Sequence, residues 1–73
     1  MEAGSIEAAR AAIRSGRPRS VERARKLLEK QGFEFTGPRT FKAGAVTYGV
    51  HEFEIGPDPL SDTGFRIERK EEN

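Results

Sequence analysis

Apolar side chains near the start of the chain recur at the spacing of a helix. Ile6, Ala9 and Ile13 lie three and four positions apart, which places all three on one helical face. Ser5 precedes them as an N-cap, because its hydroxyl can accept a hydrogen bond from a backbone N–H of the first turn. The glycine and proline of residues 16–18 then stop this first predicted helix.

The same spacing returns over residues 21–30 and predicts a second helix. Its apolar stripe consists of Val21, Ala24, Leu27 and Leu28. Ser20 is well placed as the N-cap, Lys30 lies in the last turn, and Gly32 is placed to end the helix.

After the second helix, apolar and polar residues alternate as they do in strands. Phe33 and Phe35 predict a short strand that ends at the Gly-Pro pair of residues 37–38. A longer extended stretch follows over residues 39–55, and we expect a hairpin to break it around residues 43–44.

The apolar residues of this longer stretch change parity. The first set is Val46, Tyr48 and Val50. Phe53 and Ile55 have the other parity, so a β-bulge near residues 49–51 would be needed to turn both sets toward the core.

The last third of the chain reads as a loop followed by a strand. Residues 56–64 are dense in glycine, proline, serine and aspartate, and Phe65 and Ile67 then alternate with charged residues. The predicted fold is therefore α+β, with two N-terminal helices packed on a three- to four-stranded antiparallel sheet.

Composition limits what such a fold can do. We expect one small domain over residues 1–73, with frayed ends at 1–4 and 69–73, and a core that would gain stability from a homodimer or another partner. The chain has no cysteine and one histidine, which argues against a metal centre, and we expect no cofactor. No signal peptide or apolar stretch of about 20 residues is present, so we expect a cytoplasmic protein that does not enter a membrane.

Catalytic motifs are also missing. His51 would need a carboxylate partner for acid–base chemistry, yet Glu52 beside it points to the other face of a strand. Asp58 and Asp62 lie four positions apart, but they lack the ligand series of a calcium loop. We therefore do not expect an enzyme.

Charge is sorted along the chain. Residues 10–30 carry eight basic side chains against two acidic ones, whereas residues 43–73 carry three basic against seven acidic. We expect a basic surface formed by Arg14, Arg19, Arg23, Lys26 and Lys30. The alternative is an ordinary solvated helix face with intrahelical ion pairs.

Two more specific nucleic-acid interpretations exist. In one, the two helices form a helix-turn-helix in which Arg19, Ser20 and Arg23 contact base edges, although such motifs normally belong to larger helical bundles. In the other, the aromatic residues of the strands stack on bases, against the alternative that they form the core. The aromatic candidates are Phe35, Phe41, Tyr48 and Phe53.

Two functions remain open. We expect a small binding protein that docks on a macromolecular partner, most simply a protein, as an inhibitor or adaptor. Its contact residues would include the acidic side chains Glu52, Glu54, Asp58 and Asp62. The alternative is a nucleic-acid-binding module that uses the basic face of the helices.

Overall fold

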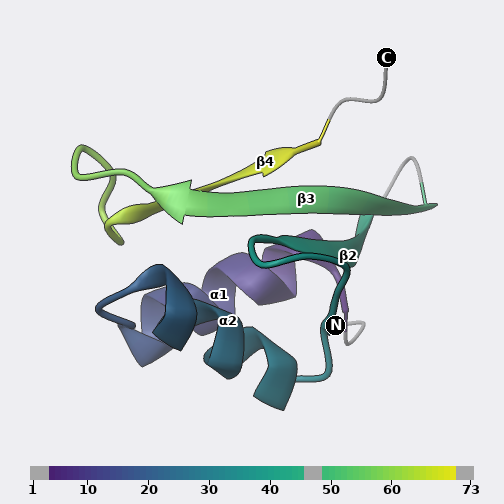
Figure 1. Ribbon diagram of the computed structural model, residues 1–73, viewed down its shortest axis with the longest axis horizontal. Helices are drawn as coiled ribbons and strands as arrows, with labels where there is room; N and C mark the ends of the chain where they lie inside the picture. Colours follow the sequence, from purple (N-terminus) through teal and green to yellow (C-terminus); the bar gives the residue numbers. More distant parts are fainter. Residues whose placement is uncertain (1–3, 46–48, 71–73) are drawn as a thin grey trace.

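The computed structural model describes residues 4–45 and 49–70. Two helices are followed by a four-stranded antiparallel sheet whose strands are ordered as in the chain, and both helices cover the same face of this sheet (Figure 1). This confirms the predicted fold class. The elements are α1 (Ile6–Gly16), α2 (Val21–Lys30), β1 (Glu34–Phe35), β2 (Thr40–Ala45), β3 (Gly49–Pro57) and β4 (Phe65–Arg69).

Local hydrogen bonds fix the beginnings of both helices as predicted. The Ser5 hydroxyl accepts from the backbone N–H of Ala8 at 3.0 Å, and the Ser20 hydroxyl accepts from that of Arg23 at 3.2 Å. Each serine thus satisfies a donor that has no partner within the helix.

The end of α2 also follows the prediction. Gly32 has a φ of 100°, and the next residue, Phe33, donates its backbone N–H to the Leu28 carbonyl at 3.0 Å. This is a Schellman ending, in which Phe33 and Leu28 also pack together as buried residues.

The end of α1 differs in detail. Gly16 is the last helical residue, and Arg17 adopts the left-handed conformation with a φ of 47°. A β-carbon built on Gly16 would lie 2.6 Å from Leu27 Cδ2. A larger residue here would force the Leu27 side chain to shift, so glycine suits the close approach of α1 and α2, and the chain reverses one residue later.

The core lies between the helices and the sheet, with Phe41 at its centre. The Phe41 ring packs against those of Phe33, Phe35 and Phe53, with centroid distances of 5.8, 5.2 and 6.3 Å. Phe41 and Phe53 are buried core residues, so their rings are not exposed for stacking on bases. Tyr48 lies outside the described residues.

The predicted bulge is wrong. Pairing between β2 and β3 runs without interruption from Thr40 opposite Glu54 to Ala45 opposite Gly49, so the hairpin also turns later than residues 43–44. Val50 lies on the face away from the core and is 68% exposed. The bulge was needed only if residues 46, 48 and 50 faced inward, and residues 46–48 lie outside the described part of the chain.

The predicted loop begins two residues later than expected, because β3 continues through Pro57. In β4, Phe65 is buried and Ile67 packs on the core, as their alternation predicts. At the ends of the described chain, the Gly4 carbonyl accepts from the Gly44 N–H at 2.7 Å, and the Lys70 N–H donates to the Glu52 carbonyl at 2.9 Å. Residues 1–3 and 71–73 of the predicted frayed ends lie outside the described range.

Candidate functional site

A surface hollow of about 320 Å³ forms where the end of α1 meets α2. We call it the basic hollow, because five of its eight lining residues are cationic and none is acidic. It is lined by Gly16, Arg17, Pro18, Arg19, Arg23, Lys26, Leu27 and Lys30.

The basic hollow brings together four of the five basic residues singled out from the sequence. These are Arg19, Arg23, Lys26 and Lys30. Arg17 joins them because its left-handed conformation turns the chain at this point. The helical spacing of Arg23, Lys26 and Lys30 on α2 indicates from the sequence that they lie together. The position of Arg17 depends instead on the close packing of Gly16 against Leu27.

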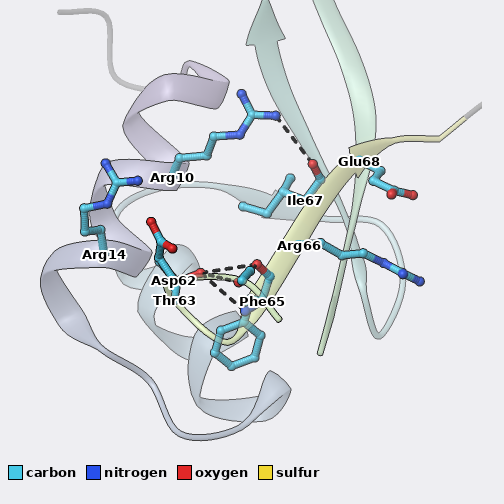
Figure 2. A pocket seen from close by; sticks show the side chains of 9 residues that line it. Arg10, Arg14, Asp62, Thr63, Phe65, Arg66, Ile67 and Glu68 are labelled. Atoms are coloured by element: carbon cyan, nitrogen blue, oxygen red, sulfur yellow. Dashed lines mark hydrogen bonds between the residues drawn. The ribbon is translucent and has the colours of Figure 1, made fainter. Parts of the chain in front are cut away.

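Arg14 does not belong to this group. Together with Arg10, it lines a different hollow of about 490 Å³ between α1, β4 and the β3–β4 loop (Figure 2). The Arg10 guanidinium there donates to the Ile67 carbonyl at 3.4 Å. Asp62 and Glu68 line the same hollow, so its charge is mixed rather than cationic.

Carboxylates neutralise little of the charge in the basic hollow. Among the described residues, ion pairs join Arg25 to Glu29, Lys26 to Glu22, Lys42 to Glu34 and Lys70 to Glu52. Of these, only the Lys26–Glu22 pair reaches the basic hollow. Its atoms are 3.7 Å apart on side chains that are 73% and 80% exposed, so water screens it strongly.

The four predicted acidic residues do not form one surface. Glu52 and Glu54 lie on the sheet face that the helices leave uncovered, and Glu52 is paired there with Lys70 at 3.8 Å. Asp58 accepts the Leu60 N–H at 3.0 Å through its side chain and so shapes the β3–β4 loop. Asp62 lies in that loop and lines the same hollow as Arg14 (Figure 2).

The uncovered sheet face is charged and largely self-neutralised. Across the strands, Glu34 is opposite Lys42, Lys42 is opposite Glu52, and the Glu52 side chain pairs with that of Lys70. This row of alternating charges keeps that part of the face hydrated, and Val50 is the one large apolar side chain among the described residues that is strongly exposed on it.

Both edges of the sheet are partly closed. At β4, the Phe65 carbonyl accepts from the Ser61 hydroxyl at 2.7 Å, and the Ile67 carbonyl accepts from Arg10. On the other side of the sheet, where the two-residue strand β1 does not extend along β2, the Gly4 carbonyl accepts the Gly44 N–H. These contacts occupy backbone groups that an added strand would use, which disfavours docking by strand addition.

The described residues give little support for a metal site or an acid–base site. Across residues 4–45 and 49–70, no three His, Cys, Asp or Glu side chains are grouped so that they could hold a metal ion. His51 is opposite Ala43 on the face of the sheet that carries the core, and the neighbouring Glu52 lies on the other face. No helix in the described part of the chain has the length and apolar character needed to cross a membrane.

Comparisons with protein-family models, with curated proteins and with solved structures found no match.

Proposed function

We propose that this is a non-enzymatic binding protein that docks on a negatively charged macromolecular partner through the basic hollow. The observation that carries the proposal is the gathering of five cations around one hollow whose lining contains no carboxylate. Such a surface attracts anionic groups and speeds their encounter with the protein. Arginine guanidinium groups also bind phosphate and carboxylate through paired hydrogen bonds.

Local conformation gives further support, because two of these cations occupy positions where another residue would stabilise the fold better. Arg17 is a non-glycine residue with a positive φ, where a β-carbon is unfavourable. Arg23 lies in the first turn of α2, close to the positive end of the helix dipole. Residues that go against local preference are expected at functional surfaces.

The acidic residues of the sheet do not oppose this mode of docking. The helices cover one face of the sheet, and the acidic residues of β3 lie on the opposite, uncovered face (Figure 1). Solvent screens exposed charges on opposite sides of the molecule from one another, since the Debye length is about 8 Å at physiological ionic strength. A polyanion that approaches the helices therefore meets mainly their own cations.

Elution from immobilised heparin, a sulfated polyanion, tests the proposal. Arg23→Glu removes a cation of the basic hollow, and Arg66→Glu makes the same change of charge on exposed β4, where the side chain points away from Arg10 and Arg14 (Figure 2). We expect Arg23→Glu to elute at clearly lower salt than the unchanged protein and Arg66→Glu to elute close to it. Equal shifts for both variants would contradict a defined docking surface.

A second candidate, a protein inhibitor or adaptor, is favoured by the β3–β4 loop. Leu60 is 95% exposed in this loop. The loop is held by bonds from the Asp58 N–H to the Gly64 carbonyl at 2.8 Å and from the Ser61 N–H to the Asp58 carbonyl at 3.0 Å. An exposed leucine on a pre-organised loop can fill an apolar pocket of a protein at low entropic cost.

A photocrosslinking residue at position 60 tests this second candidate in the cells that make the protein. We expect one discrete crosslinked protein, which should be absent when the crosslinking residue is at position 66 instead. After purification of that partner, Leu60→Ser should weaken its binding to this protein about tenfold or more. No discrete product at position 60, or an unchanged affinity, would contradict it.

A further inference from the structure

The cations of α2 form a row along one side of the helix. At 3.6 residues per turn, Arg23, Lys26 and Lys30 fall within an arc of about 60° and span about 10 Å along the axis. Arg19 extends the row beyond the N-cap, and Arg17 flanks it from the turn. The row is therefore narrow, straight and longer than a single small anion.

Nucleic acid has the charge density that this row matches. Each strand of duplex DNA carries one phosphate for about every 3.4 Å of the helix axis, so a row of this length can reach more than one phosphate of a strand. A protein surface rarely holds so many carboxylates in line without intervening cations, because like charges at such spacing repel one another. The shape and charge of the row favour a phosphate backbone over an acidic protein.

The positions of the aromatic residues favour a nucleic-acid duplex over a single strand as the partner. Phe33, Phe41, Phe53 and Phe65 are buried, and Phe35 lies half-buried beneath the Arg25 guanidinium at 5.3 Å. No aromatic ring of the described residues lines the basic hollow. Proteins that hold single strands stack bases on exposed rings, and the described surface offers none there.

We propose that the basic hollow binds the phosphates of one strand of a nucleic-acid duplex, largely without regard to base sequence. This inference rests on the proposed function and adds the class of partner. Contacts to phosphates orient a protein on the duplex and carry no direct sequence information. DNA and RNA duplexes share this backbone chemistry, so the experiment includes both.

Fluorescence anisotropy with labelled probes tests the inference. The probes are a short DNA duplex in two unrelated sequences, one of its single strands, an RNA duplex, and a polyglutamate peptide. At low salt we expect both DNA sequences to bind within about threefold of each other, and the single strand about tenfold more weakly. Four to five phosphate contacts predict a slope of about −4 in a plot of log affinity against log salt. An RNA duplex bound more tightly than DNA would identify the source of the phosphates as RNA.

Variants assign the binding to the hollow. Arg23→Glu should weaken duplex binding about tenfold and reduce the salt slope by about one, as expected for the loss of one phosphate contact. Arg66→Glu should leave both values close to those of the unchanged protein.

The outcomes separate the two proposals. Equal or tighter binding of the single strand, tighter binding of polyglutamate, or strong preference for one DNA sequence would overturn the duplex inference. The proposed function would still stand if heparin binding depended on Arg23. Strong sequence preference would instead favour the helix-turn-helix interpretation. Failure to bind heparin and every nucleic acid would contradict both proposals.

Discussion

The backbone N–H of Arg23 donates a hydrogen bond to the Ser20 hydroxyl at 3.2 Å. Arg23 thus occupies the position of the first turn that, in a capping box, holds a glutamate whose side chain bonds back to the N-cap N–H. A cation stands here in place of the acid that the helix end favours. At position 23, a cation therefore favours binding of an anionic partner, whereas an acidic residue would favour stability of the helix.

The first prediction is that Arg23→Glu stabilises the fold while it weakens binding. The substitution completes the capping box and places a negative charge at the positive end of α2, which should raise the free energy of unfolding by about 0.5 to 1 kcal/mol. Urea unfolding followed by circular dichroism measures this change, with Arg23→Ala as the control for loss of the cation, because alanine cannot bond back to the N-cap N–H. A variant less stable than the unchanged protein would show that Arg23 supports the fold.

The second prediction concerns Arg17, whose φ is 47°. Arg17→Gly should raise the free energy of unfolding by about 1 kcal/mol, because glycine adopts this conformation without a clash of its β-carbon. Arg17→Ala keeps the β-carbon and should leave stability nearly unchanged. Both variants lose the cation, so both should elute earlier from heparin. If Arg17→Gly and Arg17→Ala were equally stable, the left-handed conformation would not be costly here.

The third prediction tests the contact that places Arg17. A β-carbon at Gly16 would lie 2.6 Å from Leu27 Cδ2, so Gly16→Ala forces the half-buried Leu27 to shift. We expect a loss of about 1 kcal/mol from this overpacking. In a Leu27→Ala background the same substitution should cost much less, because the methyl groups it meets are gone. Equal effects in the two backgrounds, measured by thermal unfolding, would show that the residues are not coupled.

The fourth prediction concerns two like charges on the uncovered sheet face. Glu54 and Glu68 are directly opposite on neighbouring strands, an arrangement that destabilises a sheet. Glu68→Lys should raise the free energy of unfolding by about 0.5 kcal/mol at low salt, and the gain should fall at high salt as the charges are screened. Glu68→Gln should give a smaller gain. A gain independent of salt would point to strand propensity rather than charge.

The fold could be predicted from the sequence where neighbouring residues decide the structure. Ser5, Ser20 and Gly32 act on helix ends within a few positions of themselves, and they behave as expected. The bulge could not be predicted correctly, because the side that Val50 faces depends on the pairing of β2 with β3. Alternation alone does not identify which set of residues faces the core.

The candidate site shows the same limit. Spacing within α2 grouped Arg23, Lys26 and Lys30, since one helix sets their relative positions. Spacing could not show that Arg14 lines the other hollow, because the rotation of α1 against α2 depends on tertiary packing, including the contact between Gly16 and Leu27.

The acidic residues were grouped by their closeness in the sequence. The structure separates them, because Asp58 and Asp62 lie in the β3–β4 loop while Glu52 and Glu54 lie on β3.

The most direct measurement of docking through the basic hollow is an NMR titration of the ¹⁵N-labelled protein with a short heparin oligosaccharide. Docking through the basic hollow should concentrate the chemical-shift changes at its backbone amides, such as those of Gly16, Arg17, Arg23 and Lys26, with little change along β3. Shifts concentrated on β3 and β4, or spread evenly over the molecule, would contradict it.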